Sequence, residues 1–84
     1  MVDSVRAAWL RALVEASGPG RKWVNAREVA ALLSDRRGMV QRATSHAAGA
    51  NLRRLRAAGY AEAEMADGWS WWRPTDAGVA EAAL

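Results

Sequence analysis

The chain has 84 residues, enough for one small domain with a modest hydrophobic core, and we expect a single domain over residues 1–84. It contains no cysteine, which excludes disulfides and thiolate metal sites. No apolar run approaches the roughly 20 residues that a membrane-spanning helix needs, and the first residues do not open a signal peptide. We therefore expect a soluble, cytoplasmic protein.

Charge is unevenly distributed along the chain. Residues 36–61 contain six arginines and no acidic residue, so this segment carries +6. The other residues include 6 basic and 9 acidic side chains and carry −3, although the whole chain is only +3. Positive charge gathered on one face is typical of nucleic-acid binding. From composition alone, a solvated arginine-rich face is an equally good interpretation.

The first helix is predicted over residues 3–16, where apolar side chains recur at helical spacing. The expected core-facing stripe contains Val5, Trp9, Leu13 and Ala16, and Leu10 and Val14 widen it. Asp3 or Ser4 can cap the helix, and the sequence Ser-Gly-Pro-Gly at residues 17–20 ends it. We interpret this helix as part of the scaffold.

A short extended segment and a second helix follow. Residues 21–24 are expected to form an edge strand. Asn25 and Glu28 have the spacing of a capping box, in which each side chain accepts a hydrogen bond from the other residue's backbone N–H, so the helix begins at Asn25. Its expected buried residues are Val29, Leu32 and Leu33. We expect the helix to end near Ser34.

Residues 44–60, TSHAAGANLRRLRAAGY, predict a third helix with two different faces. The apolar face contains Ala48, Leu52, Leu55 and Gly59, and the opposite face contains His46, Ala50, Arg53, Arg54 and Ala57. Thr44 or Ser45 can cap the first turn, and Gly59 can end the last one in a left-handed conformation. Before this helix, residues 35–38 have the composition of a turn. Residues 39–43 are expected to form an irregular link, although they could also begin the helix early.

The last third of the chain predicts a β-hairpin and a short helix. Residues 60–65 and 69–73 read as two strands, joined by a turn at Asp67 and Gly68. Residues 77–83 form the final helix, which Thr75 or Asp76 can cap. The expected anchors of this helix are Val79 and Leu84.

The three hairpin tryptophans differ in the side to which they point. Because side chains alternate along a strand, Trp72 points one way and Trp69 and Trp71 the other. We expect Trp72 to fill the core and the other two to cover the second face of the sheet or a subunit contact. A stacking platform for single-stranded nucleic acid is the less favoured alternative.

This order of elements resembles a winged helix-turn-helix domain, and in particular the compact bacterial transcriptional regulators of the MarR and PadR kind. The matching segments are residues 25–30 (NAREVA), 52–60 (LRRLRAAGY) and 72–78 (WRPTDAG), and the resemblance covers nearly the whole chain. It implies an α+β fold with a three-helix core, a two-stranded β-hairpin wing and a short C-terminal helix.

The resemblance also implies a function, that of a sequence-specific transcriptional regulator that inserts helix 44–58 in the major groove of duplex DNA. It places His46, Ala47, Ala50, Arg53 and Arg54 against base edges and phosphates, with Thr44 and Ser45 suited to phosphate oxygens. The wing departs from the family pattern, because Glu62 and Glu64 precede its tip and Arg73 is its only cation. We therefore expect backbone contacts from Arg36, Arg37 and Arg42 in place of the wing.

Nothing in the sequence indicates an enzyme. His46 is the only histidine and has no acidic residue three or four positions on, so no metal site is expected. No serine has the spacing of a nucleophile elbow, and no glycine-rich phosphate loop is present. We expect no metal, no cofactor, no small-molecule effector and no membrane partner.

Two further expectations concern protein partners. The main alternative to DNA binding is a winged-helix protein–protein interaction module that uses the tryptophan-bearing hairpin. Regulators of this type usually read two half-sites as symmetric dimers, so we also expect a homodimer. The apolar residues left for its interface are Leu10, Val14, Val79 and Leu84 on the first and final helices, with Trp69 and Trp71 as the second choice.

Overall fold

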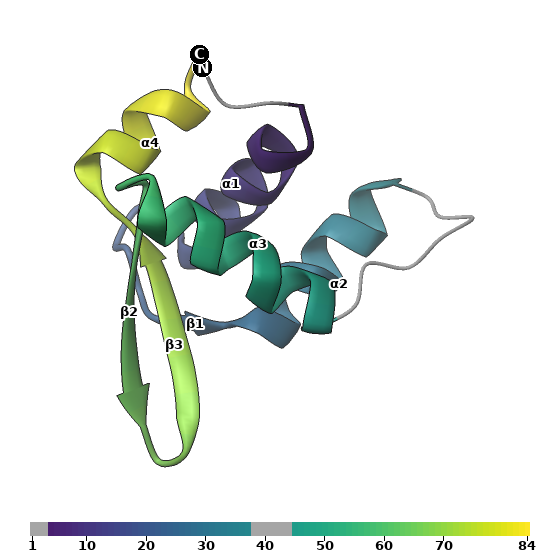
Figure 1. Cartoon of the computed structure of the whole chain (residues 1–84). Coiled ribbons are helices and arrows are strands. Elements are labelled where there is room, and N and C mark those ends of the chain that lie inside the picture. The colour runs from purple at the N-terminus through teal and green to yellow at the C-terminus, as the bar shows by residue number, and fades with distance from the viewer. Residues whose placement is uncertain (1–3, 38–44) are drawn as a thin grey trace.

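The computed structural model describes residues 4–37 and 45–84, apart from the side chains of residues 36 and 37. Its elements are α1 (Ser4–Ser17), β1 (Val24–Asn25), α2 (Ala26–Arg37), α3 (Ser45–Ala57), β2 (Ala61–Ala66), β3 (Trp69–Pro74) and α4 (Asp76–Ala82) (Figure 1). Three helices, a hairpin and a short last helix give an α+β fold with winged-helix topology, which confirms the predicted fold class.

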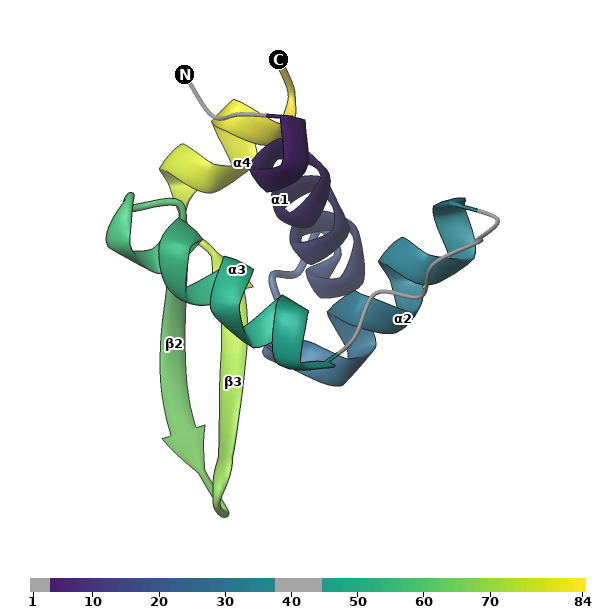
Figure 2. The ribbon, with the colours of Figure 1, turned by 45° about the vertical axis from the view of Figure 1, so that its right-hand side comes forward.

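The three strands form one antiparallel sheet in the order β1-β3-β2. β1 contributes only two residues, Val24 and Asn25, which pair with Trp72 and Trp71. β2 and β3 pair along their whole length, and their far half projects beyond the helices (Figure 2). The outer half of the hairpin therefore has few neighbours within the domain.

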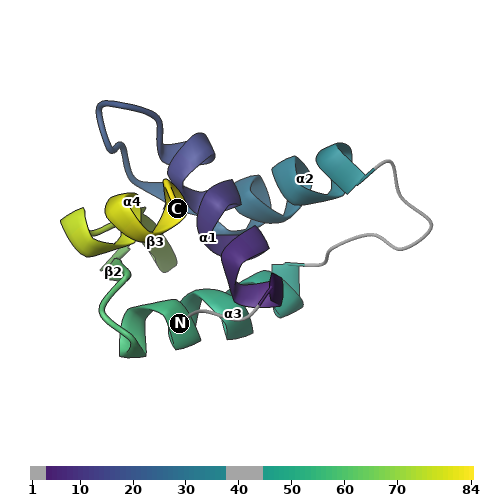
Figure 3. The same cartoon turned by 90° about the horizontal axis from the view of Figure 1, so that it is seen from above.

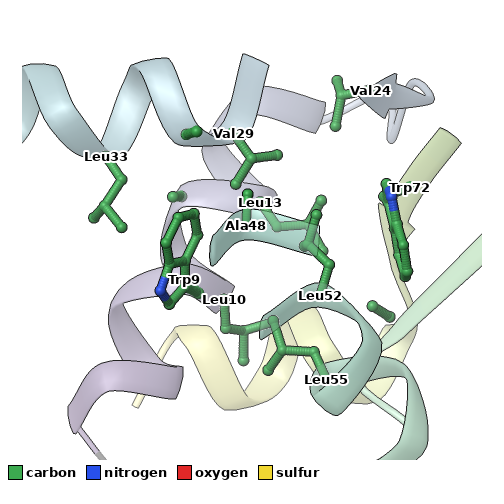
Figure 4. Packing of buried hydrophobic residues seen from close by; sticks show 13 residues of the cluster. Trp9, Leu10, Leu13, Val24, Val29, Leu33, Ala48, Leu52, Leu55 and Trp72 are labelled. Atoms are coloured by element: carbon green, nitrogen blue, oxygen red, sulfur yellow. The ribbon is translucent and has the colours of Figure 1, made fainter. Parts of the chain in front are cut away.

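The core lies between the three long helices and the inner face of the sheet (Figure 4). It consists of Trp9, Leu10, Ala12, Leu13, Val24, Val29, Ala30, Leu33, Ala48, Leu52, Leu55, Ala61 and Trp72. Four of the thirteen are alanines, so Trp9 and Trp72 supply much of the volume that the aliphatic residues leave unfilled. This matches the role expected for Trp72.

Local hydrogen bonds define the helix ends. Asn25 and Glu28 form the predicted capping box, with both N–H to side-chain oxygen distances at 2.9 Å. α3 ends in a Schellman motif, in which Gly59 has φ +87° and its N–H donates to Arg56 O at 3.0 Å. In the same motif the Tyr60 N–H donates to Leu55 O at 2.9 Å.

The hairpin turn also follows its sequence. Asp67 and Gly68 both have positive φ, at +54° and +77°. A two-residue turn with positive φ at both central positions twists in the sense that the flanking strands require, which is why Asp-Gly is a strong hairpin signal. The predicted turn is confirmed.

Several boundary and core predictions are wrong. α2 continues to Arg37 instead of ending near Ser34, because nothing in the sequence Asp-Arg-Arg breaks a helix. Val5 is 53% exposed, since α1 packs on the core only from Ala8 onward. Leu84 is 85% exposed and is no anchor, because α4 already ends at Ala82. The expected cap at residue 3 and the expected link at residues 39–43 lie outside the described residues.

Candidate nucleic-acid interface

α3 has one buried and one exposed face, as its periodicity predicts. Ala48, Leu52 and Leu55 are all 0% exposed and pack against α1, α2 and the sheet (Figure 4). On the other side His46, Arg53, Arg54 and Ala57 are exposed and Ala50 is half-buried. α3 contains no acidic residue. Its outward face is therefore cationic and otherwise made of small side chains.

The position of the Arg53 side chain depends on Gly49. A Cβ built at Gly49 would lie 3.3 Å from Arg53 Nη1, closer than most such contacts. The guanidinium thus lies back along α3, over the preceding turn, where Gly49 leaves room for it. A larger residue at this position would displace the cation from the helix surface.

Two other predicted contacts lie toward the edges of this face. Ser45 is exposed and begins α3. Ala47 is half-buried and packs against the core, so it lies on the flank of the helix, between the buried and the exposed residues. Beside it Asn51 is buried, and its Nδ2 donates to Ala47 O at 2.9 Å. The oxygen of the same side-chain amide, Oδ1, is buried without a hydrogen-bond partner among the described residues.

The arginines expected to contact the DNA backbone before α3 are not placed by the structure. Arg36 and Arg37 are the last two residues of α2, but their side chains lie outside the described part of the chain. Arg42 and Thr44 also lie outside the described residues. Their proposed role stays a prediction.

The Arg73 guanidinium has two partners within the chain, one on β2 and one just before β1. Its Nε donates to Glu62 Oε1 on the paired strand. Its Cζ also lies 4.3 Å from the centre of a Trp23 ring. This guanidinium therefore has a carboxylate and an aromatic partner within the chain, and a contact to DNA would have to compete with both.

Arg27 is a cation near the proposed interface that the sequence analysis did not assign. It lies in the first turn of α2 and is exposed. A hollow of about 400 Å³ separates the first turns of α2 and α3 from the hairpin, and its lining residues are Asn25, Ala26, Arg27, Ser45, Trp69 and Ser70. The capping box at Asn25 already placed Arg27 in the first turn of the second helix, so this position could have been read from the sequence.

No protein family, curated protein sequence or solved structure matches this chain at a significant level. Among the described residues, no helix is long and apolar enough to cross a membrane. In the same part of the chain, no three His, Cys, Asp or Glu side chains are placed to hold a metal ion.

Proposed function

We propose that the chain is a winged helix-turn-helix protein that binds duplex DNA sequence-specifically and regulates transcription, with α3 in the major groove. The observation that carries the proposal is the outward face of α3, where exposed arginines flank small residues on a helix whose other face is fully buried. The major groove admits an α-helix of this kind. The resemblance to regulators of the MarR and PadR type supports the same function.

The side chains of this face suit distinct contacts. Arg53 and Arg54 can each donate two hydrogen bonds to guanine O6 and N7, the commonest specific contact in the major groove. Ala50 allows the helix backbone to come close to the base edges. Ser45 and Arg27, at the starts of two helices, suit phosphate oxygens, because helix N-termini attract anions. The proposal needs no metal, cofactor or effector.

The proposal is tested by selecting bound duplexes from a random pool and then titrating the selected duplex at several salt concentrations. Each neutralised phosphate should contribute about −0.9 to the slope of log K against log salt, so affinity should fall steeply between about 50 and 200 mM. Absence of binding at low salt, or binding that ignores salt, would remove the DNA hypothesis.

Single variants separate the role of α3 from the overall charge. Arg53→Ala and Arg54→Ala should each weaken binding of the selected duplex by roughly 5- to 150-fold, which corresponds to about 1–3 kcal/mol for a bidentate base contact. Lys22→Ala is the matched control, because it also removes one exposed cation. Lys22 follows α1 in the chain, and the segment that leaves α1 lies on the side of α1 away from α3 (Figure 3). An equal loss in all three variants would point to general charge attraction instead of a specific interface.

We also propose that the protein reads two half-sites as a homodimer joined through α1 and α4. Leu10, expected at this interface, belongs to the core at 1% exposure and cannot contribute. Of the other residues expected there, Val14 and Val79 are half-buried, and they line a hollow of about 350 Å³. Its lining residues are Arg11, Val14, Glu15, Val79, Ala82 and Ala83. Sedimentation at about 20 μM, with and without the selected duplex, should give the mass of two chains, and a single-chain mass in both would exclude the dimer.

A further inference from the structure

The outer face of the sheet differs in composition from α3 and is not used by the proposed DNA contact. Because Trp72 and Pro74 point into the domain, Trp69, Trp71 and Arg73 lie on the opposite face of β3. Their partners on β2 are Ala66, Glu64 and Glu62. Aromatic and acidic side chains thus lie beside one another on this face, and Trp23, which precedes β1, packs at its edge.

A hollow of about 380 Å³ lies on this face. It is lined by Trp23, Glu64, Ala66, Asp67 and Trp71. The Trp71 ring is oriented by a hydrogen bond from its Nε1 to Ala66 O at 3.2 Å. Two indole rings and two carboxylates therefore converge, and no cationic side chain is among the lining residues. Its volume is at the small end of the range for ligand pockets, about 300–1,000 Å³.

One cation already lies on this surface, at the edge of the hollow. The Arg73 guanidinium lies 4.3 Å from the centre of a Trp23 ring and pairs with Glu62. This contact shows which chemistry the face accepts, a cation held between an aromatic ring and a carboxylate. Trp71 with Glu64 offers a second aromatic ring and carboxylate two pairs further along the ladder, at the next pair on the same face, without a cation of its own.

We propose that this outer face is a docking site for a partner protein, which inserts an arginine or lysine side chain of a basic segment between Trp71, Trp23 and Glu64. Charge complementarity identifies the partner: Glu62 is already paired with Arg73, but Glu64 and Asp67 at the hollow repel a polyanion and attract a cation. A peptide also fits the shape of the site, because β2 is an edge strand with no neighbour on its outer side in the described chain. Its free backbone groups can pair with an extended segment. The proposal is independent of DNA binding by α3.

The test uses the full chain and two synthetic peptides, acetyl-Gly-Arg-Gly-Arg-Gly-amide and its counterpart with glutamine in place of arginine. The readout is the set of indole N–H signals in ¹H–¹⁵N spectra, one for each of the five tryptophans. The arginine peptide should shift the signals of Trp23 and Trp71 and leave those of the buried Trp9 and Trp72 in place. The glutamine peptide should shift none.

Charge-removing variants make the assignment specific. Glu64→Gln should weaken peptide binding roughly two- to fivefold, the size expected for one exposed charge pair. Adding Asp67→Asn should increase the loss to roughly tenfold, and asparagine tolerates the positive φ of this turn residue. Asp35→Asn, which removes an exposed carboxylate of α2, is the matched control and should have no effect.

Three results would overturn the proposal. The first is an equal response to the two peptides, and the second is wild-type affinity in the Glu64→Gln variant. In the third, the same two signals shift when the chain alone is concentrated, which would make a second copy the occupant. The failure of this proposal leaves the DNA proposal intact, because Glu64→Gln should bind the selected duplex no more weakly than the wild type.

Discussion

The junction between α3, the hairpin and α4 offers a sharp test of the packing. Thr75 caps α4 by accepting the Gly78 N–H at 3.1 Å, and its hydroxyl donates to Gly59 O at 2.7 Å. The Thr75 N–H donates to Tyr60 O at 3.1 Å. These bonds draw the first turn of α4 onto the backbone that leaves α3, and Gly78 is the residue in contact with it.

Gly78→Ala should destabilise the protein strongly, because a Cβ at this position would lie 2.0 Å from Tyr60 O and 2.9 Å from Tyr60 C. Both atoms belong to the backbone and cannot rotate away, so α4 or the start of β2 must move by about 1 Å or more. Overpacking of this kind costs about 1–3 kcal/mol, and the loss of a hydrogen bond at Thr75 adds about 1 kcal/mol. For a domain of this size, about 2 kcal/mol already lowers Tm by roughly 8–16 °C.

Thermal unfolding followed by circular dichroism checks this prediction against two other glycines. Gly20→Ala is the matched control, because its Cβ meets nothing within 4 Å and its φ is not positive, and Tm should change little. Gly59→Ala also meets no atom but keeps φ +87°, so it should cost an intermediate amount, roughly 1–2 kcal/mol. If the Tm of Gly78→Ala equals that of Gly20→Ala, the close approach of Gly78 to Tyr60 is not what holds α4 in place.

Three further predictions concern stability in urea unfolding. Leu52→Ala should cost about 2–5 kcal/mol of unfolding free energy through lost burial and a cavity. Arg53→Ala and Arg54→Ala should stay within about 0.5 kcal/mol of the wild type. Arginine variants as unstable as the leucine variant would mean that the buried and exposed faces of α3 are wrongly assigned. Asn25→Ala should cost about 0.5–2 kcal/mol, and no loss would argue against the capping box. Asn51→Leu should be neutral or stabilising, because it removes a buried amide oxygen without a partner, and a loss above about 2 kcal/mol would show that this oxygen is satisfied in solution.

The sequence predicted the features that depend on neighbouring residues. The capping box at Asn25, the left-handed end of α3 at Gly59 and the Asp67–Gly68 turn all follow from the conformations and hydrogen bonds that those residue types favour. The buried face of α3 was also predictable, because Leu52 and Leu55 lie on one apolar stripe of the helix, and such a stripe faces the core. Local rules sufficed at these sites.

Features that depend on how elements meet were not predictable in this way. Leu10 and Val5 lie on the same helix, and only the position of α2 and α3 against α1 decides that Leu10 is buried and Val5 is exposed. Asn51 has the spacing of the buried stripe of α3, with Ala48, Leu52 and Leu55, but its polar side chain concealed this because polar residues are mostly exposed. The contact of Arg73 with Trp23 joins residues 50 positions apart, through a strand pairing that the short β1 segment barely indicates.

The separation of charge within so small a domain constrains how it can meet DNA. If α3 occupies the major groove, the outer face of the hairpin must point away from the phosphates, because Glu62, Glu64 and Asp67 would otherwise be brought within a Debye length of about 10 Å of them. The side of the hairpin tip toward α3 carries no such obstacle, because no acidic side chain lines the hollow that the tip residues Trp69 and Ser70 share with Arg27 and Ser45. The two faces of one hairpin can therefore serve different partners, a nucleic acid toward α3 and a basic protein segment on the outer face. If both proposals hold, the acidic outer face is compatible with DNA binding by α3, although the hairpin lacks the cations that the winged-helix resemblance implies for a wing.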